Sequence, residues 1–113
     1  MNSEEEASYR LTLAEGYLKR AQEAATHKDY LSVISNSQLA VENSAKTIIS
    51  CFRIPSWSHD PSGELLEVEE ENRDKIQQRI GSDILNDFKI LALFCRDLAP
   101  EHGRMYVLRR PEP

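Results

Sequence analysis

The chain has 113 residues, a formal net charge of −5, and Leu, Ile, Val or Phe at about a quarter of its positions. This length favours one domain, and the apolar share exceeds the roughly 20% below which chains tend to stay disordered. The acidic balance argues against a protein that covers nucleic acid or an anionic membrane with its whole surface. Abundant Leu, Ala and Glu favour helices over sheets. We therefore expect a single all-α domain over residues 1–113, with 110–113 as a disordered tail.

Helix-start signals and apolar spacing predict a first helix from Ser3 to about residue 27. Ser3 can cap the free amides, with Glu6 three residues later completing a capping box. Steps of three and four residues give this helix an apolar stripe of Leu11, Ala14, Leu18, Ala21 and Ala25.

A short turn at residues 27–29 leads to a second helix that Asp29 can cap. Its apolar face is formed by Ile34, Val41, Ala45, Ile48 and Phe52. The brief connection makes the two helices antiparallel, and Ala21 and Ala40 are among the small residues that allow close approach. Glu42 and Lys46 form an i,i+4 pair, for which we expect local helix support rather than a ligand role.

The segment Arg53–Ser62 is predicted to be a loop, because its two prolines prevent the second helix from continuing. Trp57 in this loop either covers the end of the bundle or anchors an interface, and the sequence does not separate these roles. Asp60 and Pro61 read as the cap and the first residue of a third helix.

The third helix is expected to run to Gly81, which can end it in the left-handed conformation. Residues 69–75 contain no apolar side chain, so the helix either breaks or is largely solvated near Asn72. The acidic run Glu67–Glu71 is expected to be a solvated face, with contact to a basic partner as the alternative.

Ser82 can cap a fourth helix whose core stripe is the most regular in the chain: Ile84, Phe88, Leu91, Cys95 and Leu98. Pro100 then disturbs the helix, and residues 101–110 form either a short fifth helix or a bent continuation. The pattern predicts a four- to five-helix up-and-down bundle. The first hairpin also fits a tetratricopeptide unit, but no second copy follows, so we rank that reading lower.

Several function classes find no support in the sequence. Cys51 and Cys95 lack a CxxC spacing, and we expect both to be small buried hydrophobes in a reducing cytoplasm. The longest apolar run has six residues, against about 20 for a membrane span, so we expect neither a membrane span nor a signal peptide. No phosphate-binding glycine loop and no His or Cys pair at ligand spacing is present, so we expect no cofactor and no metal.

The segment 96–110 carries a net charge of +2 while the rest of the chain carries −7. It contains the string Arg96, Asp97 and, five residues later, His102. Cleavage of RNA without a metal needs a base for the 2′-hydroxyl proton and a cation for the phosphorane, which His and Arg supply. Further candidates for phosphate or nucleotide binding are Arg104, Arg109 and Arg110.

The alternative reading of this string is structural. Arg96 then complements the helix dipole and pairs with Asp97 or Glu101, while His102 caps the helix end or lies exposed. In an unbroken helix, residues six apart lie about 120° apart, so a shared site needs a bend at Pro100 or a second copy of the chain.

The first hairpin resembles the HEPN family in two stretches, residues 14–21 (AEGYLKRA) and 37–46 (SQLAVENSAK), which are similar to its small-residue first helix and its A-x-E-x-x-x-K second helix. His59 and Asp60 before the third helix and residues 98–103 (LAPEHG) are also similar to it. The resemblance implies a bundle that commonly dimerises and often pairs with a minimal nucleotidyltransferase, as toxin and antitoxin or as a two-subunit enzyme. The family's terminal R-Y-P string is here Arg109-Arg110-Pro111.

For active members, the resemblance implies metal-independent ribonuclease activity through an Arg-polar-x-His motif, which Arg96, Asp97 and His102 match. By this analogy Arg96 stabilises the phosphate, Asp97 orients the site, and His102 acts as base or positions the 2′-hydroxyl. We expect a homodimer that acts on RNA or a nucleotide, partnered with a nucleotidyltransferase. The alternative is a non-catalytic module whose basic C-terminal segment binds phosphate or an acidic patch of a partner protein.

Overall fold

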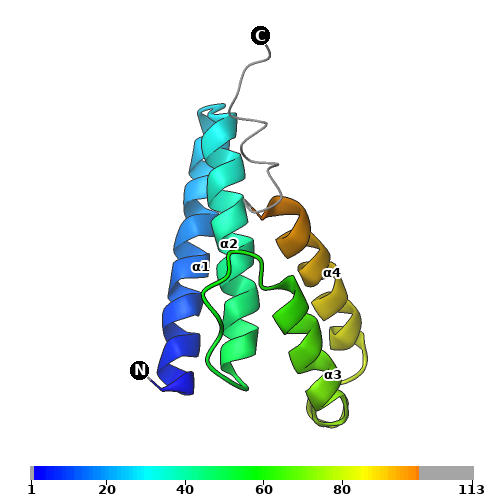
Figure 1. The fold of residues 1–113 in the computed structure, drawn as a ribbon. Coiled ribbons are helices and arrows are strands. Elements are labelled where there is room, and N and C mark those ends of the chain that lie inside the picture. Colours follow the sequence, from blue (N-terminus) through cyan, green and yellow to red (C-terminus); the bar gives the residue numbers. More distant parts are fainter. Residues whose placement is uncertain (1, 100–113) are drawn as a thin grey trace.

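The computed structural model describes residues 2–99, which form four helices joined by short turns at 27–29 and 80–82 and by a longer loop over 51–61 (Figure 1). They are α1 (Ser3–Thr26), α2 (Tyr30–Ser50), α3 (Ser62–Arg79) and α4 (Asp83–Leu98). The described part of the chain contains no strand, so the all-α bundle is confirmed. None of these helices is long and apolar enough to span a membrane. The predicted fifth helix over 101–110 and the predicted tail over 110–113 lie outside the described residues.

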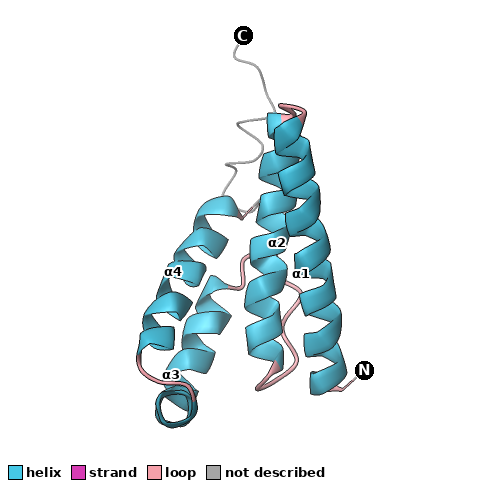
Figure 2. Ribbon diagram, turned by 180° about the vertical axis from the view of Figure 1, so that it is seen from behind, coloured by secondary structure: helices cyan, strands magenta, loops and turns pink. Residues whose placement is uncertain are grey.

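The four helices form two antiparallel hairpins with α2 at the centre. In Figure 1, α1 and α2 make the longer hairpin, and Figure 2 shows α3 and α4 against α2 on the side away from α1. Helix α2 contacts all three other helices, whereas α1 contacts α2 alone among them. Two turns follow the predicted chemistry. The Asp29 carboxylate accepts a hydrogen bond from the Ser32 N–H in the first turn of α2, and Gly81 has the positive φ of 113° that suits glycine after α3.

The hydrophobic core lies between α2, α3 and α4. Its fully buried members are Ala45 and Ile49 of α2 and Leu65 and Val68 of α3. Helix α4 contributes a stripe that is mostly as predicted: Phe88 and Cys95 are buried, Ile84 and Leu91 pack against the core, and Ala92 joins them. Burial of these side chains holds the second hairpin against α2.

Helix α1 buries less of its predicted stripe than expected. Ala14 and Ala21 are buried, but Leu11 and Leu18 are about half exposed. A helix that packs on a single neighbour can bury only the narrow face along the contact, so the outer members of a wide apolar stripe remain in solvent. The stripe therefore identified the correct face of α1 but overestimated its burial.

Helix α1 begins at Ser3 as predicted, but its N-cap lies one residue earlier than expected. Asn2, not Ser3, is the N-cap, and its side-chain oxygen accepts the Glu5 N–H at 2.8 Å. The Ser3 hydroxyl instead donates to the Ser50 carbonyl at the end of α2. Helix α3 begins one residue later than predicted, at Ser62, whose N–H donates to Asp60 Oδ1 at 3.1 Å.

Helix α3 does not break near Asn72 but continues through the polar segment. Glu69 in this segment is buried, and Arg73 donates two hydrogen bonds to its carboxylate at 3.1 and 3.2 Å. Those bonds hold the pKa of Arg73 above its usual value. Most of the acidic run is solvated as predicted, but Glu69 faces inward because its charge is paired within the same helix.

We expect Leu65→Ala to lower the free energy of unfolding by about 3 kcal/mol, because a fully buried leucine leaves a cavity when it is truncated. Leu18→Ala is the matched control, a helical leucine that is half exposed, and it should cost less than about 1 kcal/mol. Urea denaturation followed by circular dichroism measures both values. Equal losses at the two positions would contradict the assigned core.

Candidate functional site

Arg96 and Asp97 lie in the last turn of α4, at the molecular surface. The Arg96 side chain is 57% exposed, and its Nε lies 3.8 Å from Asp97 Oδ1. Among residues 2–99, Arg96 forms no other ion pair. An exposed pair at this distance contributes little to stability, so the guanidinium is available to an external anion.

The helix that carries Arg96 ends before the rest of the predicted motif. Its C-cap, Ala99, has φ −63° and ψ 133°, the extended conformation expected of a residue before proline. The helical-wheel separation of Arg96 from His102 therefore does not apply, because the α-helix stops at Leu98. His102 and the candidate phosphate-binding residues Arg104, Arg109 and Arg110 lie outside the described residues. The structure thus brings together Arg96 and Asp97.

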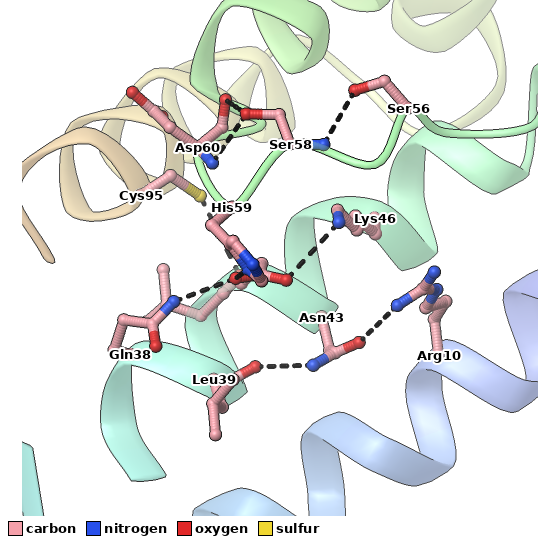
Figure 3. A network of polar contacts seen from close by, with 12 residues as sticks. Arg10, Gln38, Leu39, Asn43, Lys46, Ser56, Ser58, His59, Asp60 and Cys95 are labelled. Carbon is pink, nitrogen blue, oxygen red and sulfur yellow. Dashed lines mark hydrogen bonds and ion pairs between the residues drawn. The ribbon is translucent and has the colours of Figure 1, made fainter. Parts of the chain in front are cut away.

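A buried polar cluster lies on α2, facing the loop that precedes α3 (Figure 3). The side chains of Glu42 and Lys46 are 7% and 3% exposed, and their charged atoms are 3.4 Å apart. Glu42 Oε1 also accepts a hydrogen bond from the Gln38 side-chain amide at 2.9 Å. The predicted i,i+4 pair is present, but it is buried rather than on the surface. Such a pair is costly to break, since either charge left alone would be uncompensated.

His59 connects the loop to this cluster. Its Nδ1 lies 3.1 Å from Glu42 Oε1, and a carboxylate oxygen can only accept, so the contact places a hydrogen on Nδ1. Trp57, two residues earlier, is 97% exposed and therefore does not cover the end of the bundle. Its interface role stays a prediction.

A second polar link joins α1 to α2. Arg10 of α1 donates to the side-chain oxygen of buried Asn43 at 3.1 Å and pairs with Glu6 at 2.9 Å. The Asn43 amide in turn donates to the Leu39 carbonyl at 2.8 Å. These bonds satisfy a buried amide and fix the register between the two helices.

The two cysteines differ in their exposure to solvent. Cys95 is buried as predicted, and its thiol lies 3.8 Å from the Val41 carbonyl. Burial, reinforced by the nearby Asp60 and Glu42 carboxylates, raises the pKa of Cys95 to about 12. Its thiol therefore stays protonated and unreactive at neutral pH. Cys51 is exposed, contrary to the prediction, because it lies just past the last turn of α2.

Among the described residues, no group of three or more His, Cys, Asp and Glu side chains is arranged to hold a metal ion.

Sequence reasoning missed the buried polar cluster and underrated His59. The available signal was the spacing of Gln38, Glu42 and Lys46, which follow one another every four residues and so share one side of α2. A row of polar side chains along one side of a helix ordinarily indicates a face exposed to solvent. It is buried here because α2 has neighbours on several sides, which no local pattern reveals.

The four helices of the described residues place the protein among the all-α bundle domains, and comparison with protein families identifies its family. Residues 7–94 match the HEPN domain. The match covers most of the chain, which therefore belongs to the HEPN family, as the sequence resemblance indicated. It ends two residues before Arg96, so the Arg-polar-x-His string lies outside the matched part. No curated protein and no solved structure matches the chain.

We expect Glu42→Met and Lys46→Met each to lower the free energy of unfolding by about 3 kcal/mol, because each leaves one buried charge without its partner. The double variant, which removes both charges, should lose less than either single variant. Glu67→Met, which removes half of an exposed ion pair with Arg53, is the control and should be nearly neutral. Chemical denaturation of the four variants measures the coupling between Glu42 and Lys46. A loss in the double variant equal to the sum of the two single losses would contradict this coupling.

Proposed function

We propose that this HEPN protein is a metal-independent endoribonuclease of the cytoplasm that acts as a homodimer and as the helical subunit of a minimal nucleotidyltransferase pair. The observation that supports catalysis is the position of Arg96: an exposed guanidinium, weakly paired, in the last turn before the chain leaves the helix. A cation held in this way is suited to a phosphate, because it loses little when its intramolecular partner is displaced.

In the proposed reaction, the 2′-hydroxyl oxygen of RNA attacks the adjacent phosphorus and the 5′-oxygen leaves. His102 takes the 2′-hydroxyl proton, and Arg96 stabilises the charge that develops on the phosphorane. Asp97, whose carboxylate lies 3.8 Å from Arg96 Nε in the free protein, orients the site before the phosphate takes its place beside the guanidinium. The proton taken up by His102 is returned to the leaving 5′-oxygen, so the products are a 2′,3′-cyclic phosphate and a 5′-hydroxyl. No atom of this scheme requires a bound metal.

Dimerisation is supported by the outer surface of α4. Ile90 and Phe94, one turn apart, are about half exposed, and so is Leu93 beside them. Large apolar side chains gathered on one helix face are typical of association surfaces. A twofold axis along this face would bring two α4 helices together and place the two Arg96 side chains near one interface.

The nucleotidyltransferase partnership is supported by family membership and by the exposed Trp57, which could anchor such a subunit. Arg104, Arg109 and Arg110 would then add phosphate contacts for RNA or a nucleotide. The second candidate function is a non-catalytic binding module. It is favoured by the same available Arg96, since a cation that binds phosphate need not cleave it.

We expect the purified protein to cleave RNA in the presence of EDTA and to leave 2′,3′-cyclic phosphate ends. Arg96→Ala and His102→Ala should each slow cleavage by about 100-fold or more, because each removes a group that acts in the transition state. Arg79→Ala, at the end of α3, is the control and should leave the rate unchanged. No cleavage by the wild type, in an assay where a known ribonuclease cuts the same RNA, would contradict the proposed catalysis and favour the non-catalytic binding module.

We expect light scattering to give about twice the chain mass of 13.0 kDa for the wild type. Phe94→Glu places a charge in the proposed interface and should yield a monomer. Leu18→Glu makes the same change at a half-exposed leucine of α1 and should leave the dimer intact. A wild-type monomer at concentrations near 1 mM would overturn the proposed assembly.

A further inference from the structure

A groove runs between the first turn of α3 and the last two turns of α4, with a volume of about 430 Å³. Gly63 and Leu66 line it from α3, and Lys89, Ala92, Leu93 and Arg96 line it from α4. This volume lies within the range of pockets that hold small ligands, about 300–1,000 Å³. The groove adjoins the proposed dimer face: Leu93 belongs to both surfaces, whereas Ile90 and Phe94 do not line the groove.

The groove combines apolar walls with two cations. Leu66 and Leu93 are both partly exposed there, and buried Ala92 lies between the helices. Lys89 and Arg96 are seven residues apart, two turns of α4, and so lie along one side of it. Within residues 2–99, Lys89 forms no ion pair and Arg96 forms only its weak pair with Asp97. The Ser62 amide at the start of α3 is already bonded to Asp60, and the two side-chain cations supply the positive charge of the groove.

We infer that this groove holds the base of an unpaired nucleotide whose phosphate is bound by Arg96. The inference rests on the proposed phosphate-binding role of Arg96. It adds a binding site for the base, which Arg96 does not contact. A nucleobase has two flat apolar faces, which Leu66 and Leu93 can contact, while its phosphate remains at the cationic edge. A base paired within a duplex could not enter, so the groove selects single-stranded RNA.

Gly63 offers a way to test the groove without disturbing the core. A Cβ added at Gly63 would meet no atom within 4 Å, and the residue has ordinary helical geometry, so a larger side chain can project into the groove. Gly16 in α1 is a matched control: it is also helical, and an added Cβ there also meets nothing within 4 Å. Both substitutions should preserve or strengthen the helix, since leucine is the better helix former.

The experiment titrates the full-length protein with adenosine 5′-monophosphate and with ribose 5-phosphate, followed by NMR chemical-shift changes. The two ligands share a phosphate and a ribose, and only the first has a base. We expect the wild type to bind the nucleotide about tenfold more tightly than the sugar phosphate, because the leucine walls remove part of the base from water. Gly63→Leu should remove this preference and leave ribose 5-phosphate binding unchanged, while Gly16→Leu changes neither.

Arg96→Ala should lower the affinity for both ligands by a similar factor, because both carry the phosphate that Arg96 binds. Equal affinity of the wild type for the two ligands, absence of binding by both, or an unchanged preference in a folded Gly63→Leu variant would each overturn the inference. Neither ligand can be cleaved at a 2′-hydroxyl, so failure of the RNA-cleavage assay would overturn the proposed catalysis without affecting this result.

Discussion

A buried carboxylate must be neutralised and hydrogen-bonded, and in this bundle Glu42 meets the requirement through Lys46, Gln38 and His59. The first two donors come from α2 itself, one turn on either side. The third comes from the loop 51–61, which passes over α2 before α3 begins (Figure 1). Because α2 is the helix that contacts all the others, this one cluster ties together the central helix and the connection between the two hairpins. The cluster thus fixes where this connection crosses α2, while the apolar core holds the second hairpin against the same helix.

The position of Arg96 follows from the packing of α4 in that hairpin. Phe88, Ala92 and Cys95 face the core, and Arg96 comes one turn after Ala92, at the edge of the buried face. An arginine at such an edge can place its aliphatic stem beside apolar groups and its guanidinium in solvent. The helix then ends at Leu98, before Pro100. A cation at the edge of the core and at the end of a helix is a favourable place for a phosphate, and the α3–α4 groove extends from it.

Local sequence patterns predicted the positions of the helices well, but they predicted the burial of individual side chains less well. The turn at Asp29 and the stop at Gly81 were correct, because capping and left-handed backbone depend on a few adjacent residues. Burial was less predictable. Leu18 was expected inside and is half exposed, whereas Glu69 was expected in solvent and is buried. Burial depends on how many neighbours a helix acquires, and α1 acquires one where α2 acquires three.

The sequence alone determined the all-α class, the antiparallel first hairpin, the core face of α4 and the membership of the HEPN family, because periodicity and capping are local properties and family resemblance is carried by residue order. It also singled out Arg96 and Asp97. Only the tertiary structure decided that the Glu42–Lys46 pair is buried, that His59 reaches it, and that a groove opens beside Arg96. Each of these joins residues from separate elements, and their meeting depends on the packing of α3 and α4 against α2, which is the sum of many weak contacts.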